Sequence, residues 1–359
     1  MIWQRILASA FIKSNTVSGY EMTNQAVSLI QSDRAETWQE ILSDLITDPQ
    51  ELLRLLELNP DTCPYSLEAL AQFPLKAPRP FVERIEKSNW NDPLLLQIWP
   101  SEFEDNQADG FVVDPLNEEE FNPIPGLLHK YQGRVLLTAA PHCAIHCRYC
   151  FRRHFDYRAN SPSRAQWEEA FAYIAADSSI EEVILSGGDP LAISDKQFHW
   201  LLQQLANIKT LTTVRIHTRL PIVIPQRITR ELIDCLNETR LRVVMVVHCN
   251  HRQELDSTVT DKFDTLGDAG VTMLNQAVVL KDVNDNADAL IDLNKALFKH
   301  NVLPYYLHMP DQVAGTEHFY VTDQHATALI KTLHASLPGY LVPRLVRENP
   351  GERGKTRIA

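Results

Sequence analysis

The sequence predicts an α/β protein with a parallel sheet, arranged as a full or partial (βα) barrel. From Arg134 onward, short runs of β-branched residues alternate with stretches long enough to be helices, which is the pattern of repeated βα units. The residues best suited to chemistry fall just after the predicted strands, where such barrels carry their active sites. The N-terminal part of the chain lacks this alternation, so we expect it to form a helical extension.

The N-terminal extension, residues 1–110, is expected to be mostly helical. Apolar residues recur at helical spacing between Trp38 and Ile46, which predicts a first helix. Asp48-Pro49 is expected to end that helix and to begin another over residues 52–56. The apolar run at residues 6–12 is too weak for a signal peptide and predicts an amphipathic first segment.

Residues 111–340 are expected to form the barrel and residues 341–359 a C-terminal segment. Each predicted strand connects to the next through a predicted helix, which requires parallel strands. The strands are expected at residues 135–138, 182–185, 213–218, 242–248, 272–279, 303–308 and 340–345. The helices are expected near residues 164–176, 195–206, 229–237, 258–269, 286–300 and 323–335.

The composition excludes several classes of protein. Of the 359 residues, 44% are hydrophobic and 22% charged, which is typical of a globular chain. No apolar run approaches the roughly 18 residues of a membrane span. The net charge of −12 argues against a general nucleic-acid binder, although a local basic patch remains an alternative. We expect neither a nucleic-acid nor a membrane partner. The residues that could form the patch are Arg148, Arg152, Arg153 and Arg158.

Three of the six cysteines form the strongest motif in the chain. Cys143, Cys147 and Cys150 have the spacing C-x3-C-x2-C and directly follow the first predicted strand. Three thiolates on one loop can hold three corners of a [4Fe–4S] cluster and leave one iron open to an outside ligand. Two alternatives stay open: a zinc site completed by His142, His146 or His154, and cysteines that bind nothing. Clustered thiols favour a reducing compartment, and we expect a cytoplasmic protein.

A resemblance to a known superfamily rests on this loop and on one further motif. The cysteine spacing, with Tyr149 before the last cysteine, resembles the radical S-adenosylmethionine (SAM) superfamily. Ser186-Gly-Gly-Asp-Pro190, one βα unit later, is similar to the glycine-rich stretch with which that superfamily contacts SAM. Glycine there would let the backbone approach the ligand. The expected fold is therefore a partial (βα)6-type radical SAM barrel.

Within that superfamily the chain resembles the lysine 2,3-aminomutases. The similarity runs in order from Tyr131 to Lys355, and the N-terminal residues match more loosely. Its motifs are Cys150–His154, Leu185–Leu191, Leu220–Thr229, His248–His251, Asn275–Leu280, Pro304–Tyr306 and Gly315–Phe319.

The resemblance implies three cofactors and their sites. The [4Fe–4S] cluster is expected on Cys143, Cys147 and Cys150. SAM is expected to bind the glycine-rich stretch that follows the second predicted strand. Pyridoxal 5′-phosphate (PLP) is expected to form a Schiff base with Lys355, the implied catalytic residue. From composition alone Lys355 would be a solvated lysine, and Asn349 breaks the only phosphate-loop pattern around it. The SAM contacts would be Ser186, Gly187, Gly188 and Asp189, and the other PLP contacts Lys130, Tyr131 and Arg134.

The resemblance also implies how the substrate, L-lysine, is held. Arg152 matches the arginine that binds the substrate carboxylate, and Asp311 an aspartate that holds the ε-ammonium group. The second ammonium-binding aspartate of the family falls on Glu348, which differs by a methylene and leaves the effect on the substrate undecided. His217-Thr-Arg219 and His248 are expected to line the SAM and substrate cavity.

The compact C-terminus narrows the expected function. Clostridial-type relatives extend past the PLP lysine and carry zinc-binding cysteines there, whereas this sequence resembles the bacterial enzymes that make (R)-β-lysine for elongation factor P. The implied reaction is a radical 1,2-amino migration that converts L-α-lysine to (R)-β-lysine. The implied partners are a flavodoxin or ferredoxin as electron donor, and a functional link to elongation factor P and its β-lysine ligase. A homo-oligomer is left open. The alternatives are a free-standing metabolic aminomutase and a non-enzymatic iron–sulfur or zinc regulator.

Overall fold

A computed structural model of the chain describes residues 36–62, 65–156, 163–352 and 354–359. Thr37–Ala359 form one compact unit. The predicted amphipathic first segment and Arg158 lie outside the described residues. The predicted boundaries at residues 110 and 340 remain predictions. Among the described residues, no helix is both long and apolar enough to cross a membrane.

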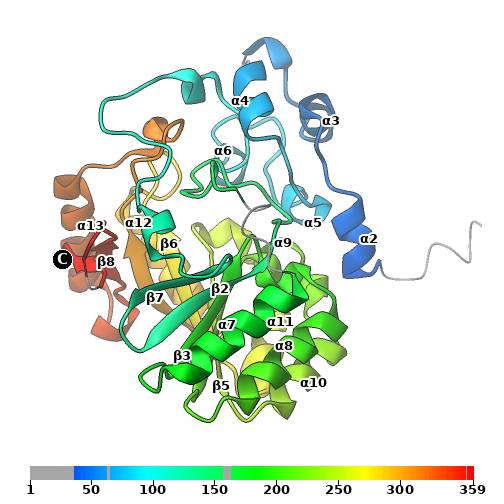
Figure 1. Cartoon of the computed structure of the whole chain (residues 1–359). Coiled ribbons are helices and arrows are strands. Elements are labelled where there is room, and N and C mark those ends of the chain that lie inside the picture. Colours follow the sequence, from blue (N-terminus) through cyan, green and yellow to red (C-terminus); the bar gives the residue numbers. More distant parts are fainter. Residues whose placement is uncertain (1–35, 63–64, 157–162, 353) are drawn as a thin grey trace, which may run out of the picture. The chain divides into compact units, whose positions relative to one another are not determined.

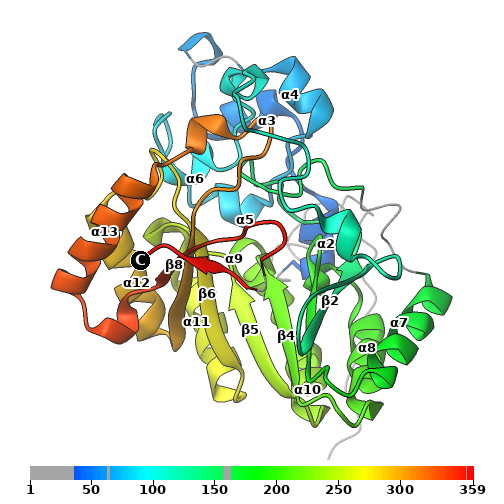
Figure 2. The same ribbon diagram turned by 60° about the vertical axis from the view of Figure 1, so that its left-hand side comes forward.

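A single sheet of nine strands follows the order of the chain, so that each strand lies beside the one before it (Figures 1 and 2). Strands β2 to β8 are parallel, and β1 and β9 pair antiparallel at the two edges. This topology confirms the predicted partial barrel. The strands are β1 (Leu127–Tyr131), β2 (Arg134–Ala140), β3 (Glu182–Gly187), β4 (Thr213–Thr218), β5 (Arg242–Val247), β6 (Thr272–Val278), β7 (Val302–His308), β8 (Arg344–Arg347) and β9 (Thr356–Arg357).

Six predicted strands are confirmed to within two residues at each end, and the seventh is displaced. Residues Gly339–Leu341 form the 3₁₀ helix η8, and β8 begins only after Pro343, which has no N–H to donate to a ladder. The edge strands β1 and β9 were not predicted. Strand β1 joins β2 through Gln132-Gly133, where Gly133 takes a positive φ of 79° that glycine adopts without strain.

Helices between the strands cover the sheet, and each begins where the sequence supplies a cap. Ser163, for example, accepts a hydrogen bond from the N–H of Gln166, the third residue of its helix. The other five use serine, threonine, aspartate or asparagine in the same way. The helices are α7 (Arg164–Ala176), α8 (Asp195–Asn207), α10 (Arg230–Glu238), α11 (Ser257–Asp268), α12 (Ala287–Lys299) and α13 (Asp323–Ser336).

The main core lies between the strands and these helices. Buried strand residues such as Val183 and Ile216 belong to one apolar cluster with buried helix residues such as Leu201 and Leu205. Burial of this surface is the main force that holds the βα units together.

The N-terminal helices are short, and they lie over one end of the sheet in both views. The first ends earlier than predicted, because Asp44 caps it and Ile46 instead forms an antiparallel bridge with Ala77. Helix α5 contacts the short helix α9 (Leu220–Val223), and α6 contacts the 3₁₀ helix η6 (Arg252–Glu254). The N-terminal helices are α2 (Trp38–Ser43), α3 (Pro49–Leu55), α4 (Leu67–Gln72), α5 (Arg79–Val82) and α6 (Pro93–Leu96).

Candidate active site

Most of the predicted site residues follow the parallel strands at their carboxyl ends. The cysteine loop (residues 141–156) follows β2, and Ser186 to Asp189 lie at the end of β3. Arg219, His248, Asp311 and Glu348 come shortly after β4, β5, β7 and β8. Parallel strands place these ends at one edge of the sheet, so the topology gathers the residues there.

The three cysteines of the cysteine loop are partly buried free thiols. Burial, followed by the nearby charges of Cys150 and Asp189, raises the pKa of Cys143. Burial and Cys147 raise the pKa of Cys150 to about 12. Such crowded thiols become thiolates when a cationic centre compensates their charge, so the donor set fits an iron–sulfur cluster. Among the described residues, no three or more His, Cys, Asp or Glu side chains are gathered as a group that could hold a metal ion, so the fit to a cluster rests on the chemistry of the three thiols and not on their present positions.

Two of the histidines considered for a zinc site bond to the backbone instead. His146 Nδ1 lies 2.8 Å from the Pro74 carbonyl oxygen, and its ring stacks on Phe73. His154 Nε2 lies 3.1 Å from the Ala314 carbonyl oxygen. These contacts attach the cysteine loop to the segment around Pro74 and to the segment around Ala314.

The three arginines of the predicted basic patch that the structure describes, Arg148, Arg152 and Arg153, are buried and paired with carboxylates. Glu104 accepts hydrogen bonds from Arg148 and Arg153, each at 2.5 Å, and the three side chains are at most 1% exposed. Arg153 also donates to the Gly315 carbonyl oxygen. These two arginines therefore hold the cysteine loop against the N-terminal segment, and they are not available to bind nucleic acid.

The glycines of the Ser186–Asp189 stretch accommodate the chain itself. A Cβ on Gly188 would lie 2.2 Å from the His142 carbonyl oxygen, and one on Gly187 would lie 2.8 Å from the Ala140 carbonyl oxygen. The N–H groups of Gly188 and Asp189 donate to these same carbonyls. The missing side chains thus allow the end of β3 to pack on the cysteine loop. The contact of these glycines with SAM stays a prediction.

The carboxylate of Asp189 is fully hydrogen-bonded within the protein, mostly to the segment that follows β4. Its carboxylate accepts hydrogen bonds from the Thr218 hydroxyl and from the N–H groups of Arg219, Leu191 and Leu220. The predicted contact with SAM would therefore have to be indirect, through the backbone that Asp189 positions.

Arg152 already holds a carboxylate in this structure. Its Nε and Nη2 donate to the two oxygens of Glu118 at 2.7 and 2.6 Å, and Nη1 lies 3.4 Å from the Ser186 hydroxyl. This two-point geometry is the one expected for a substrate carboxylate. Glu118 belongs to the 3₁₀ helix η3 (Glu118–Phe121), and no sequence motif marked it.

Lys355 belongs to a cluster that joins the two edges of the sheet. Glu348 accepts hydrogen bonds from Lys355 Nζ at 2.6 Å, from the Tyr131 hydroxyl at 2.7 Å and from Lys130 Nζ at 3.1 Å. Lys130 and Tyr131 come from β1, at the opposite edge from β9. Side chains therefore connect the first and last parts of the sheet, and Lys355, the predicted PLP lysine, is one of them.

Charge in this cluster suits a phosphate. Burial opposes ionisation of Glu348, but the adjacent Lys355, Tyr131 and Lys130 bring its pKa well below the ordinary value. The guanidinium of Arg134 lies over the Tyr131 ring, 4.6 Å from its centroid. Lys130 and Lys355 thus share the Glu348 carboxylate, while Arg134 lies against Tyr131 of the same cluster. Three cations against one carboxylate leave an excess of positive charge beside a lysine amine, which fits the phosphate of PLP.

The two carboxylates predicted to bind the substrate ammonium group, Asp311 and Glu348, have pKa values shifted in opposite directions. Glu348 is an ionised partner of Lys355, an arrangement that the sequence did not predict. Burial, together with the negative charge of Glu348, raises the pKa of Asp311 to about 7. A substrate ammonium group beside Asp311 would offset both effects.

Three histidines form a further part of the site: His217 and His248, which the sequence predicted, and His308, which it did not. Burial lowers the pKa of His217, His248 and His308, that of His248 to about 3, with Lys355 among the neighbouring charges in each case. The Nε2 atoms of His217 and His308 are buried without a hydrogen-bond partner among the described residues. For His308, its position at the end of β7 was the available signal. These neutral imidazoles can face a ligand.

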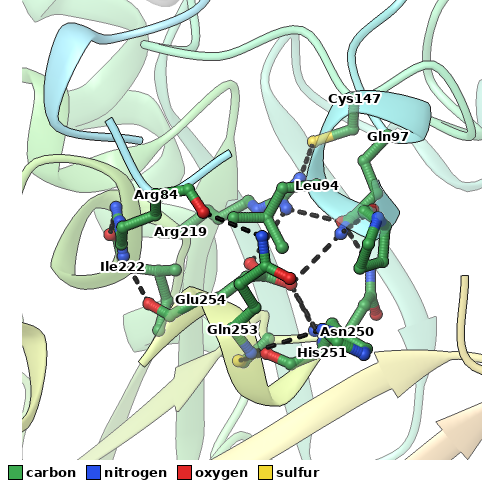
Figure 3. Close-up of polar contacts among 12 residues, drawn as sticks. Arg84, Leu94, Gln97, Cys147, Arg219, Ile222, Asn250, His251, Gln253 and Glu254 are labelled. Carbon is green, nitrogen blue, oxygen red and sulfur yellow. Dashed lines mark hydrogen bonds and ion pairs between the residues drawn. The ribbon is translucent and has the colours of Figure 1, made fainter. Parts of the chain in front are cut away.

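Arg219 does not simply line a cavity. Its Nη1 donates to the Cys147 Sγ at 2.6 Å, so it contacts a predicted cluster ligand directly (Figure 3).

Comparison with known proteins gives consistent results. The model of the Radical SAM superfamily matches residues 137–293. The L-lysine 2,3-aminomutase of Haemophilus influenzae is 49% identical over 324 residues, which cover 90% of this chain and 96% of that protein. The L-lysine 2,3-aminomutase of Escherichia coli is 47% identical over 324 residues, covering 90% and 94%. That of Clostridium subterminale is 36% identical over 279 residues, covering 77% and 67%.

Proposed function

Because this chain belongs to the family of the L-lysine 2,3-aminomutases, which are radical SAM isomerases, we propose that it converts L-α-lysine to (R)-β-lysine by radical 1,2-amino migration. The product would supply the modification of elongation factor P. The observation that carries the proposal is the set of bonds that brings Lys130, Tyr131 and Lys355 onto Glu348. A lysine amine beside surplus cationic groups is what a PLP enzyme requires.

The cofactors would supply the difficult chemistry. When bound, the cluster with SAM provides a radical that removes hydrogen, and PLP carries the migrating amino group. Cys143, Cys147 and Cys150 would hold the cluster. Ser186, Gly187 and Gly188 would present backbone and hydroxyl groups to SAM, with Asp189 fixing their position.

The protein residues at the other end of the site would hold PLP. Lys130 and Arg134 would bind the phosphate, Lys130 as a point charge and Arg134 as a fork. Tyr131 would orient the group through its hydroxyl. Lys355 must lose a proton before it can attack a carbonyl, and Glu348 is placed to hold the lysine while it is charged.

The substrate would be fixed at both ends. Arg152 would exchange the carboxylate of Glu118 for that of lysine, since both offer the same two oxygens. Asp311 would bind the ε-ammonium group. Gripping both charged ends fixes the carbon from which hydrogen is removed, and such positioning accounts for a large part of catalysis.

The proposal is tested by anaerobic turnover of the full chain. The protein would be reconstituted with iron and sulfide, then supplied with PLP, SAM, a strong reductant such as reduced flavodoxin, and L-lysine. Products would be resolved on a chiral column. We expect (R)-β-lysine; (S)-β-lysine would indicate a metabolic aminomutase, and 5′-deoxyadenosine without β-lysine would exclude lysine as substrate.

A pair of cysteine variants separates the cluster from general stability. Cys143→Ser is expected to lose the cluster and turnover. Cys235→Ser, which changes a buried cysteine on α10, is expected to keep both. Equal loss in the two variants would show that the assay reports folding rather than cluster ligation.

A further inference from the structure

Arg219 is fixed beside the cysteine loop by its own backbone. It directly follows β4, where its N–H and that of Leu220 donate to the buried carboxylate of Asp189 at 2.7 and 3.1 Å. Its side chain is only 7% exposed. From there Nη1 reaches the Cys147 Sγ at 2.6 Å and the Tyr149 hydroxyl at 2.8 Å.

The other face of the guanidinium is held by groups from two more segments. Nη2 donates to Gln97 Oε1 at 2.7 Å and to Glu254 Oε2 at 3.1 Å (Figure 3). Gln97 follows α6, and its carbonyl oxygen accepts the N–H of Arg148 in the cysteine loop. Glu254 ends η6, and its other oxygen accepts the N–H groups of Asn250 and His251.

These contacts leave the guanidinium little freedom to turn away from Cys147. Its Nη2 is aimed by Gln97 and Glu254, and Glu254 is itself completely buried. Asn250 also donates to Gln97 Oε1 and to the Tyr149 hydroxyl, which closes the network. A cation held this rigidly acts on the sulfur without having to reorganise.

A hydrogen bond to a cluster sulfur changes the stability of the two redox states unequally. One-electron reduction adds negative charge to the cluster and its thiolates. A nearby positive charge and an N–H···S bond stabilise the reduced state more, and they raise the reduction potential. An adjacent carboxylate acts in the opposite direction, and both effects are strong where water is excluded.

We propose that Arg219 is a positioning residue that donates to the Cys147 thiolate of the cluster and raises its reduction potential, while Glu254 limits that increase. The inference rests on the proposed function in one respect, that Cys147 ligates a cluster. It gives the N-terminal segment a role in the chemistry, because Gln97 helps to aim Arg219.

The test is a redox titration of the reconstituted protein, followed by the EPR signal of the reduced cluster. Arg219→Met removes the charge and the hydrogen-bond donor, and its midpoint potential is expected to be about 59 mV more negative. For one electron, that shift corresponds to a tenfold change in the ratio of reduced to oxidised cluster at a given potential. Arg219→Lys is expected to shift it less in the same direction. Glu254→Gln is expected to shift it to more positive potential.

The opposite signs distinguish tuning from damage. If the substitutions merely loosened the fold, the midpoint potentials of Arg219→Met and Glu254→Gln would shift in the same direction or would not shift. Arg227→Met is the matched control, since Arg227 is also fully buried and is paired with a carboxylate, Asp195, that does not belong to the cysteine loop. Its midpoint is expected to equal that of the wild type.

Iron content identifies which idea fails. A wild-type protein that binds no four-iron cluster would contradict the proposed function itself. With the wild-type cluster intact, an unchanged midpoint in Arg219→Met, or the same direction of shift in Arg219→Met and Glu254→Gln, would overturn the role of Arg219. If Arg219→Met cannot hold iron, the shifts in Arg219→Lys and Glu254→Gln decide the question in the same way.

Discussion

Two networks of polar and charged residues lie in the site, and they differ in how deeply they are buried. The cysteine-side network joins Cys147, Arg219, Gln97 and Glu254, and its central ion pair has side chains 7% and 0% exposed. The lysine-side network joins Lys130, Tyr131, Glu348 and Lys355, and its pair Lys355–Glu348 has side chains 24% and 18% exposed.

The difference matches what each network must do. A buried and fully bonded pair costs desolvation and cannot exchange partners easily, so it serves as a fixed frame. A half-open pair can be broken by an arriving ligand, because water and the ligand replace the lost contacts. We therefore expect substitutions on the cysteine side to alter stability and cluster properties, and substitutions on the lysine side to alter ligand exchange.

The largest effect on the lysine side is expected from Lys355→Ala. Loss of the amine removes the covalent site for PLP, so amino migration should fall by roughly a thousandfold or more while the fold persists. The measurements are β-lysine formation, PLP absorbance and thermal unfolding. Lys331→Ala, an exposed lysine on α13, is the control and should be unchanged. Full activity in Lys355→Ala would contradict a PLP mechanism.

The next largest effect is expected from Glu104→Ala. Glu104 is the buried carboxylate that pairs with Arg148 and Arg153 of the cysteine loop. Removing the carboxylate leaves Arg148 and Arg153 as buried cations without it, which should cost about 3–5 kcal/mol of unfolding free energy. Denaturant unfolding measures this. Asp234→Ala breaks the exposed i,i+4 pair with Arg230 and should cost about 0.3–0.5 kcal/mol. Similar losses of unfolding free energy in the two variants would show that the buried pairs contribute no more to stability than an exposed pair does.

A pH dependence is expected from Asp311, whose pKa is about 7 in the ligand-free chain. The ionised form binds an ammonium group, so kcat/KM for lysine should rise as the pH rises through about 7. Asp311→Asn should lose this rise and most of the lysine binding. A profile that is unchanged in Asp311→Asn would assign the rise to another group.

Stability gives an independent check on Asp311. Because its pKa is raised in the fold, its protonated form stabilises the native state, and that contribution is lost as the pH rises from about 4 through about 7. Asp311→Asn should flatten this part of the curve. The measurement is unfolding free energy against pH for both proteins.

The smallest effect is expected from Glu118→Gln, which weakens the internal competitor for Arg152. Lysine would no longer have to displace a charged carboxylate, so its dissociation constant should fall by up to about tenfold, or about 1.4 kcal/mol. Calorimetry on the PLP-loaded protein measures the change. Glu120→Gln, an exposed neighbour on η3, should bind lysine as the wild type does. Weaker binding in Glu118→Gln would mean that Glu118 supports the site instead of occupying it.

Local sequence patterns were sufficient for much of the fold. Alternation of β-branched runs with capped helices predicted β2 to β7 closely, because strand propensity and helix capping depend on residues near each other in the chain. Strand β9 has only two residues, Thr356–Arg357, and exists because β8 lies beside it. No local signal could predict it.

The candidate site divides in the same way. The spacing of Cys143, Cys147 and Cys150 is a local property, and the sequence alone placed the three thiols on one loop after a strand. Only the tertiary structure decided what surrounds them. Glu348 meets Tyr131 across 217 residues, and Gln97 meets Arg219 across 122. Such contacts depend on how the sheet curves and where the N-terminal helices pack, so charge partners in a buried site follow from the fold and not from spacing along the chain.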